Sequence, residues 1–208
     1  IIKIAAAREL VNGIQINTDK KILEDFQKSA GFDYTKDQKR SIKEIFTDLS
    51  SGRVMDRLLS GDVGFGKTEV AMNAMLAVIL DGYQAIFVCP TTLLATQHYH
   101  SMQKRFSEFG ISIAKLDGKT PAKEKVHIKK GLASGEIKLV IGTHSLLEIQ
   151  TNNLALVIID EEHKFGVKQK EKLKHLREDV HIFSMSATPI PRTLNLALSK
   201  LKGMSSLL

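Results

Sequence analysis

Residues 61–68 are the part of this sequence whose types and spacing are best suited to hold phosphate groups. They match the pattern of a glycine, four residues and then Gly-Lys-Thr. Glycines let backbone N–H groups turn inward around phosphate oxygens. Lys67 would reach the terminal phosphates, and the Thr68 hydroxyl would bind Mg²⁺, which needs only one or two protein oxygens. The predicted nucleotide-binding residues here are Gly61, Asp62, Val63, Gly64, Phe65, Gly66, Lys67, Thr68 and Glu69.

A second candidate for chemistry is the acidic stretch Asp160-Glu161-Glu162-His163, which follows an apolar run. Carboxylates at the end of a buried strand are costly unless a cation or hydrogen bonds balance them, and Mg²⁺ is a natural counter-ion. Asp160 would hold the metal together with Thr68, and Glu161 would orient and deprotonate an attacking water. The predicted catalytic residues are Lys67, Asp160 and Glu161. A solvated acidic loop that caps the next helix is the alternative.

Apolar runs that alternate with amphipathic stretches predict the elements that position these residues. Residues 58–60, 85–89, 111–116, 138–141, 156–159 and 181–185 read as strands. Before residue 53 we expect only helices, at about 4–11, 18–30 and 35–50, and the sequence ends in a helix-like stretch. The alternation predicts an α/β fold with a mainly parallel sheet flanked by helices. In such sheets ligands bind beyond the carboxyl ends of the strands, where both candidate motifs fall.

Composition narrows the class of protein further. Thirty Lys and Arg against 23 Asp and Glu give the 208 residues a net charge of +7, which favours a polyanionic partner such as nucleic acid. No apolar run approaches the roughly 20 residues that cross a bilayer, and the first residues do not read as a signal peptide. We therefore expect a soluble cytoplasmic protein with no membrane partner. The single cysteine, Cys89, reads as a buried thiol, and the chain ends suggest a piece of something larger.

Five short motifs, at residues 61–68, 90–94, 141–144, 160–163 and 186–188, occur in an order that resembles the first RecA-like motor domain of superfamily 2 helicases and translocases. Longer strings at residues 64–71, 160–167 and 187–195 are similar to the Mfd family of bacterial transcription-repair coupling factors. The RecG family of branch-migrating helicases shares parts of these strings. It typically has Ser at the position of Phe65 and Gln at that of Glu162, so a RecG-like domain is the alternative.

The resemblance implies a motor domain that uses ATP and magnesium to translocate on double-stranded DNA. Proteins of this family displace a stalled RNA polymerase and recruit nucleotide excision repair through UvrA, by modules that we expect outside this chain. A second RecA-like domain of the same protein would supply an arginine to the site, so the 208 residues alone should bind nucleotide but hydrolyse it poorly. A nucleotide-dependent binding switch is a further alternative, although the intact catalytic set argues against it.

The resemblance also implies roles for residues outside the two central motifs. Phe32 and Gln38 would contact the adenine, although Thr35 and Gln38 also fit a capping box. The residues that would couple the nucleotide site to DNA or to the second motor half are His163, Ser186, Thr188 and Arg192. The residues that would contact DNA are Thr91, Thr92, Gln97, Gly118, Thr143 and His144. For the threonines among them, capping of a helix is the alternative role. Residues 1–31 would form a helical lead-in, and residues 32–208 the motor domain.

Overall fold

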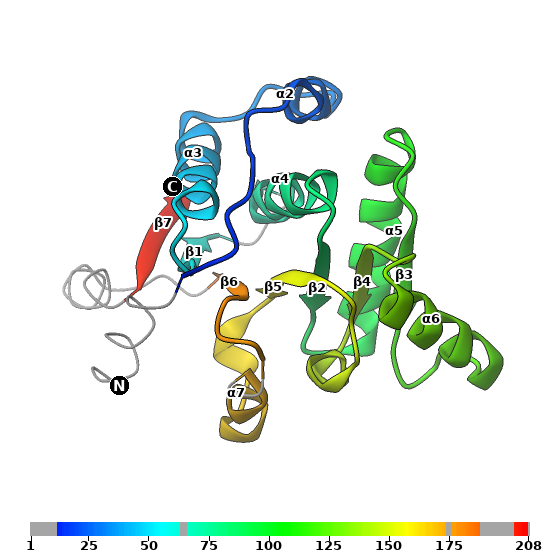
Figure 1. Cartoon of the computed structure of the whole chain (residues 1–208). Coiled ribbons are helices and arrows are strands. Elements are labelled where there is room, and N and C mark those ends of the chain that lie inside the picture. Colours follow the sequence, from blue (N-terminus) through cyan, green and yellow to red (C-terminus); the bar gives the residue numbers. More distant parts are fainter. Residues whose placement is uncertain (1–11, 63–65, 174–175, 188–201, 208) are drawn as a thin grey trace.

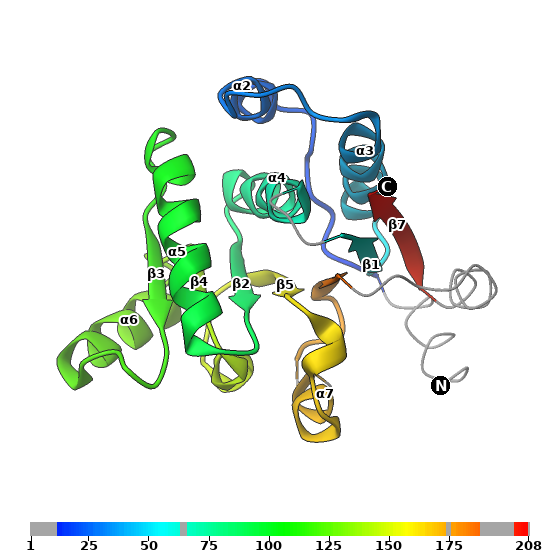
Figure 2. The same ribbon diagram turned by 180° about the vertical axis from the view of Figure 1, so that it is seen from behind.

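The computed structural model of the chain describes residues 12–62, 66–173, 176–187 and 202–207. A central sheet lies between two layers of helices (Figure 1), and the view from behind in Figure 2 shows the same layering. The glycine-rich stretch at residues 61–68 and the acidic stretch at residues 160–163 both follow strands of this sheet. The order of the strands therefore decides which side chains come close together.

Within the described residues, one sheet has seven strands in the order β3-β4-β2-β5-β6-β1-β7. Every neighbouring pair runs parallel. The strand bounds are β1 Asp56–Gly61, β2 Gln84–Val88, β3 Ile113–Leu116, β4 Leu139–Gly142, β5 Leu154–Ile159, β6 His181–Ser186 and β7 Gly203–Leu207. The predicted parallel α/β fold is therefore confirmed, and each of the six predicted strands is present with bounds that differ by a few residues.

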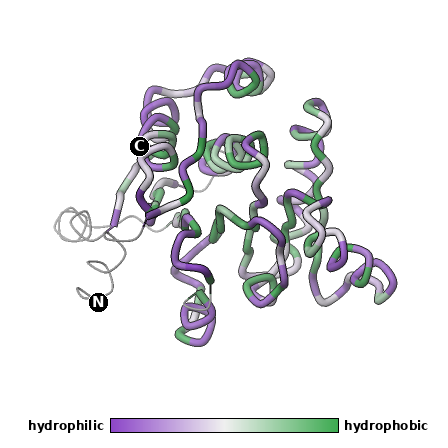
Figure 3. Tube along the Cα trace, in the orientation of Figure 1, coloured by the Kyte–Doolittle hydropathy of each residue, from purple (hydrophilic) through white to green (hydrophobic). Residues whose placement is uncertain are grey.

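One face of the sheet is covered by α2 (Lys21–Lys28), α3 (Lys36–Ser50), α4 (Gly66–Leu80) and α5 (Thr92–Ser107). Successive strand side chains point to opposite faces, so Phe87 packs on this side while Ile86 and Val88 pack on the other. Helix α4 is buried along nearly its whole length, and Figure 3 shows it largely in the colours of hydrophobic residues. A helix that is apolar on all sides is typical of a position between a sheet and other helices.

The opposite face is covered by α6 (Ala122–Ser134), the short helix η1 (His144–Glu148) and the segment with η2 (Glu162–Lys164) and α7 (Val167–Leu173). Ile128 and Leu132 of α6 and Leu146 of η1 pack with the strand residues of this face. Helix α7 has no fully buried residue and is mostly hydrophilic in Figure 3. This layer is therefore the more exposed of the two.

The last strand, β7, corrects the expectation of a helix-like end. It pairs with β1 in parallel, with Gly61 opposite Leu207. The strand reads Gly-Met-Ser-Ser-Leu, so it lacks the apolar run that marks the other strands. Its place at the end of the strand order explains this composition, because among the described strands it pairs with β1 alone and little of it enters the core.

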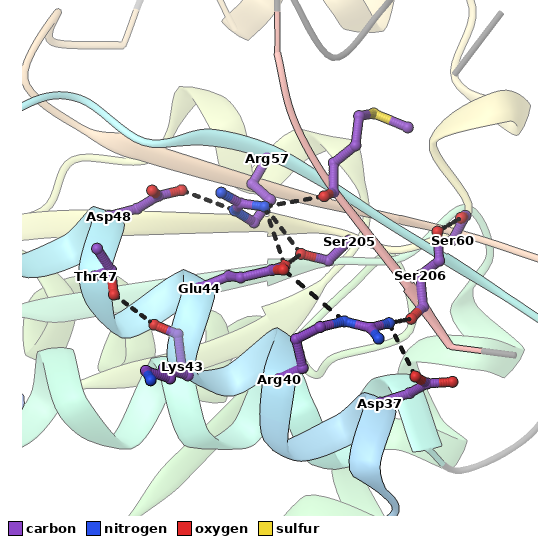
Figure 4. Close-up of polar contacts among 11 residues, drawn as sticks. Asp37, Arg40, Lys43, Glu44, Thr47, Asp48, Arg57, Ser60, Ser205 and Ser206 are labelled. Carbon is purple, nitrogen blue, oxygen red and sulfur yellow. Dashed lines mark hydrogen bonds and ion pairs between the residues drawn. The ribbon is translucent and has the colours of Figure 1, made fainter. Parts of the chain in front are cut away.

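Polar side chains of α3 and β1 attach β7 to the rest of the sheet (Figure 4). The guanidinium group of Arg57 lies at the centre and is mostly buried. Its partners are Asp48 Oδ2 at 2.8 Å, Ser205 Oγ at 2.9 Å, the Met204 carbonyl oxygen at 3.1 Å and Glu44 Oε2 at 3.4 Å. Arg40 adds a hydrogen bond to the Ser206 carbonyl oxygen at 3.0 Å. We call this set of residues the Arg57 network.

The segment before α3 differs in part from the predicted helical lead-in. Residues 1–11 lie outside the described residues, and residues 12–20 contain no helix. Helix α2 begins at Lys21 without a side-chain cap, so the start expected at about residue 18 is wrong. Among the helices that the structure describes, none has the length and apolar character that a membrane crossing requires.

Candidate nucleotide-binding site

The glycine-rich loop lies between the carboxyl end of β1 and the first turn of α4, as the sequence predicted. Lys67 is buried, and its Nζ atom donates to the carbonyl oxygens of Gly61 at 2.8 Å and Asp62 at 2.5 Å. Burial lowers the pKa of Lys67, while the charges of Asp160, Asp62 and Glu161 act in the opposite direction. The predicted lysine and the acidic stretch therefore lie close enough for their charges to interact. The Thr68 side chain is also buried, and Val63, Gly64 and Phe65 lie outside the described residues.

Strand β7 approaches one glycine of the loop closely, Gly61, and lies at an ordinary contact distance from a second, Gly66. A Cβ atom on Gly61 would lie 3.0 Å from Leu207 Cβ and 3.1 Å from the Leu207 carbonyl oxygen. A Cβ atom on Gly66 would lie 3.4 Å from both Gln38 and Leu207. The strand that the sequence did not predict thus packs directly against the glycine-rich loop.

The acidic stretch begins where β5 ends. The Asp160 N–H donates to the Val88 carbonyl oxygen at 2.8 Å, which keeps Asp160 in line with the sheet and buried. Its carboxylate contacts His98 of α5, with 2.8 Å between Nε2 and Oδ2. Sequence reasoning missed His98, because the contact joins positions 62 residues apart. The available signal was that His98 follows β2, which is the neighbour of β5 in the sheet.

Glu161 has an unusual backbone conformation. Its φ of 51° and ψ of 55° fall in the left-handed region, and it is the only non-glycine residue with positive φ among the residues described. Such a conformation is strained for a residue with a Cβ atom and tends to occur at functional sites. Its carboxylate pairs with Lys164 at 2.7 Å. The positive φ distinguishes Glu161 from its neighbour Glu162. The Glu162 carboxylate instead pairs with Lys202 at 3.2 Å.

The predicted coupling residues are described in part. Ser186 ends β6, and its Oγ lies 3.2 Å from Nδ1 of His163, which follows the acidic pair. This contact joins the first residue of the motif at residues 186–188 to the acidic stretch. Thr188 and Arg192 lie outside the described residues.

The predicted adenine-contacting residues lie at the start of α3. Thr35 and Gln38 form the expected capping box, in which Thr35 Oγ1 accepts from the Gln38 N–H and Gln38 Oε1 accepts from the Thr35 N–H. The Gln38 amide also donates to the Gly66 carbonyl oxygen at 3.3 Å, so it reaches the glycine-rich loop. Phe32 is 52% exposed, and its ring lies 5.8 Å from that of Tyr34.

Glu69 belongs to a buried polar cluster beside this region. Its carboxylate accepts hydrogen bonds from Tyr34 at 2.5 Å and from Arg105 of α5. Sequence reasoning placed Glu69 among the nucleotide-binding residues and missed Tyr34 and Arg105. A cavity of about 170 Å³ lies next to the cluster, lined in part by Phe32, Thr68, Glu69 and Arg105.

The predicted DNA-contacting residues follow three neighbouring strands. Thr91, Thr92 and Gln97 come after β2, Gly118 after β3, and Thr143 and His144 after β4. Thr91 also caps α5, because its Oγ1 accepts from the Leu94 N–H at 3.2 Å. Because β3, β4 and β2 adjoin in the sheet, these residues occupy one half of its carboxyl edge, and the loop after β1 and the acidic stretch after β5 occupy the other.

A glycine-rich loop and an acidic pair at the carboxyl edge of an all-parallel sheet define a RecA-like nucleotide-binding domain. Residues 35–197 match the sequence family described as DEAD/DEAH box helicase, and the chain belongs to this family.

Relatives among well-studied proteins are similar to the whole chain. It is 55% identical over 207 residues to the transcription-repair-coupling factor of Helicobacter pylori strain J99. The match covers 100% of this chain and 21% of that protein. The protein of the same name from Bacillus subtilis is 42% identical, covering 99% of this chain and 18% of its own length. The chain thus spans about a fifth of the length of these relatives.

Solved structures are similar as well. A structure of RecG bound to a three-way DNA junction has a TM-score of 0.86 and 43% identity, over 98% of this chain and 28% of that one. The helicase MrfA bound to DNA has a TM-score of 0.67 at 18% identity, which is a likeness of fold alone. These comparisons confirm the resemblance to superfamily 2 motor domains and to transcription-repair coupling factors.

Proposed function

We propose that this chain is the ATP-binding motor domain of a double-stranded DNA translocase. The observation that carries the proposal is that Lys67 and Thr68, after β1, and Asp160 and Glu161, after β5, lie at the carboxyl ends of the same parallel sheet. The charges of both acids act on Lys67. A triphosphate bound by the loop would bring its terminal phosphate between the lysine and the acids. Family membership supports the use of nucleotide, and the names of the relatives support the link to DNA repair.

The side chains suit the hydrolysis of ATP in distinct ways. Lys67 would bind the β- and γ-phosphate oxygens through its ammonium group. Glu161 would orient a water molecule toward the γ-phosphorus and accept its proton while the bond to the bridging oxygen breaks. The hydroxyl of Thr68 and the carboxylate of Asp160 are hard oxygen donors, which fit Mg²⁺. When bound, Mg²⁺ would neutralise charge on the phosphate oxygens.

The larger setting of the domain follows from its relatives. Residues 32–208 would be the first of two RecA-like domains, with residues 1–31 as the lead-in, and the whole protein would act in the cytoplasm. The longer protein would displace stalled RNA polymerase and recruit excision repair through UvrA, with both partners bound outside these residues. The 208 residues alone would bind nucleotide and hydrolyse it slowly, since the second domain supplies an arginine.

The test is the ATPase activity of the longer protein with and without linear duplex DNA. Duplex should stimulate turnover, and Glu161→Gln should lower kcat by about 10²-fold to 10⁴-fold with little change in nucleotide affinity. Glu162→Gln is the matched control, because Glu162 pairs with Lys202 and has no assigned part in the reaction. Activity that ignores DNA would favour the nucleotide-dependent switch, and equal losses in both variants would contradict the role of Glu161.

A RecG-like branch-migration domain is the second candidate, favoured by the 43% identity to RecG over 98% of the chain. A three-way junction and a linear duplex of equal length separate the two functions. Stronger stimulation by the linear duplex would support the translocase, whereas stronger stimulation by the junction would support branch migration.

A further inference from the structure

Helix α5 directs one side chain into the candidate nucleotide-binding site. His98 Nε2 lies 2.8 Å from Asp160 Oδ2, and the two side chains are only 18% and 10% exposed. Because a carboxylate accepts hydrogen bonds, Nε2 is the ring nitrogen that carries the hydrogen and donates it. His98 therefore contacts the carboxylate that would hold Mg²⁺ without being part of either central motif.

Packing fixes both partners of this hydrogen bond. The imidazole ring of His98 lies against Phe87 of β2, with 5.1 Å between the ring centroids. Cys89, the buried thiol after β2, places its Sγ within 4.8 Å of a ring nitrogen of His98 and a carboxylate oxygen of Asp160. Asp160 itself is held to β2 through its N–H and the Val88 carbonyl oxygen. A shift of α5 relative to β2 would therefore move the His98 ring relative to the carboxylate.

We propose that His98 is a positioning residue that holds the Asp160 carboxylate in the orientation that binds Mg²⁺. The hydrogen bond occupies Oδ2, so Oδ1 is the oxygen offered to the cation. Second hydrogen-bonding groups commonly orient metal ligands in this way. The inference rests on the proposed function, because it requires Asp160 to be the magnesium ligand.

The hydrogen bond between His98 and Asp160 also connects the site to the residues at the start of α5. The same helix begins with Thr92 and is capped by Thr91, two of the residues assigned to DNA. Leu93, in the first turn, is 67% exposed, whereas His98, in the second turn, is directed inward. One rigid helix thus joins the DNA-assigned half of the sheet edge to the metal-binding carboxylate.

The test compares two substitutions of similar size, His98→Gln and His98→Met. A glutamine amide can donate a hydrogen bond from nearly the position of Nε2, and a methionine fills the same space without a donor. The measured quantity is the Kd of the 208-residue chain for N-methylanthraniloyl-ATP, once with Mg²⁺ and once with EDTA. The ratio of the two Kd values reports the contribution of the cation. His100→Met, exposed on the same helix, is the control.

We expect His98→Met to reduce this ratio by about tenfold to 100-fold, the usual loss when a supporting group of a metal ligand is removed. His98→Gln and His100→Met should keep the ratio of the unaltered chain. The Kd in EDTA should stay unchanged in all variants, whereas a merely structural role would raise it. The melting temperature should fall only in His98→Met, because the buried Asp160 carboxylate loses a hydrogen-bond donor there. If His98→Met did not fold, His98→Leu would give the same comparison.

Three outcomes would overturn the inference. An unchanged ratio in His98→Met would remove the positioning role, and equal losses in the Gln and Met variants would remove the hydrogen bond as its cause. Both results leave the proposed function standing, because the unaltered chain still binds Mg²⁺ and nucleotide. Failure of the unaltered chain to bind the ATP analogue would instead overturn the proposed function and this inference together.

Discussion

Lys67 is a buried ammonium group whose hydrogen bonds go to carbonyl oxygens of its own loop. A triphosphate offers it charged acceptors, and hydrogen bonds between charged groups contribute about 1.5–3 kcal/mol. Lys67→Met should therefore raise the Kd for ATP by roughly 10-fold to 100-fold. The free energy of unfolding without nucleotide should stay the same or rise, since burial disfavours the charge of the lysine.

Isothermal titration calorimetry and urea denaturation measure these two quantities for Lys67→Met. The control is Lys130→Met, a change of the same kind on the exposed face of α6. An unchanged Kd in Lys67→Met would contradict the proposed role of the loop.

His181 makes the stability of the fold depend on pH. Its Nδ1 accepts from the Met55 N–H at 2.9 Å, and Nε2 donates to the Ile14 carbonyl oxygen at 2.6 Å. Burial lowers the pKa of His181 below its ordinary value, although the Ile14 carbonyl oxygen opposes this shift. The unfolded chain therefore takes up a proton at a higher pH than the folded chain. The free energy of unfolding should fall as the pH drops below about 6.5, and level off below the lowered pKa.

Urea denaturation at several pH values tests the prediction for His181. His181→Asn, whose amide oxygen can replace Nδ1 as the acceptor, should flatten the fall in stability below neutral pH. His127→Asn, an exposed histidine of α6, should keep it. A fall of equal size in both variants would show that other groups cause the pH dependence.

Functional residues that lie close together in the sequence could be predicted from the sequence alone. The Gly-Lys-Thr turn and the Asp-Glu pair are contiguous, so spacing alone identifies them, and Thr35 and Gln38 were identified as a capping box in the same way. His98 and Arg105 became visible only in the fold, because each contacts a carboxylate more than 30 residues away. A hydrogen bond between elements far apart in the chain leaves no periodic signal in the sequence.

At the scale of elements, the Arg57 network should stabilise the edge strand β7. Arg57→Met would leave two carboxylates, Asp48 and Glu44, without their shared cation and would remove two hydrogen bonds to β7. We expect a loss of about 2 kcal/mol in the free energy of unfolding, and faster hydrogen exchange of the β7 amides. Arg177→Met is the control, because the pair between Arg177 and Asp179 is exposed and such pairs contribute only about 0–1 kcal/mol.

Equal losses in Arg57→Met and Arg177→Met, or unchanged exchange of the β7 amides, would contradict the role of the network. The network also explains why β7 could not be predicted from the sequence. The apolar run of β5 is buried at every residue, whereas β7 has one buried residue, Ser205, and is held by polar contacts from α3 and β1.

The start of α2 shows a second limit of reasoning at this scale. Thr18 and Asp19 are good capping residues, yet the helix begins after them without a side-chain cap. Leu23 and Phe26 are buried in the core, so packing rather than capping sets the position of this short helix. Tertiary packing of this kind overrides local preference.

For the whole molecule, the strand order divides the carboxyl edge of the sheet into two halves. The loop after β1 and the acidic stretch after β5 form the half assigned to nucleotide, and the ends of β2, β4 and β3 carry the residues assigned to DNA. β2 and β5 are direct neighbours, so the two halves meet where His98 contacts Asp160. The sequence predicted both sets of residues, and the fold adds the place where they join.

Because the chain has a net charge of +7, we expect its binding to duplex DNA to depend steeply on salt concentration and little on the DNA sequence. If about four phosphates are contacted, doubling the salt concentration should weaken binding roughly tenfold, since counterions are released on binding. Thr92→Val removes a neutral hydroxyl, so we expect a loss of about fivefold in affinity without a change in the salt dependence. Fluorescence anisotropy with two duplexes of unrelated sequence measures both effects.

Thr47→Val is the matched control for this experiment, because Thr47 is exposed on α3, outside the half of the edge assigned to DNA, and its hydroxyl bonds only to the Lys43 carbonyl oxygen among the contacts described. Equal affinities for Thr92→Val and Thr47→Val would mean that the start of α5 does not contact the backbone of DNA. Affinity that ignores salt, or that follows the sequence of the duplex, would contradict phosphate contacts as the basis of binding. A translocase that moves along any duplex needs contacts of the kind predicted here, since base contacts would halt it at preferred sites.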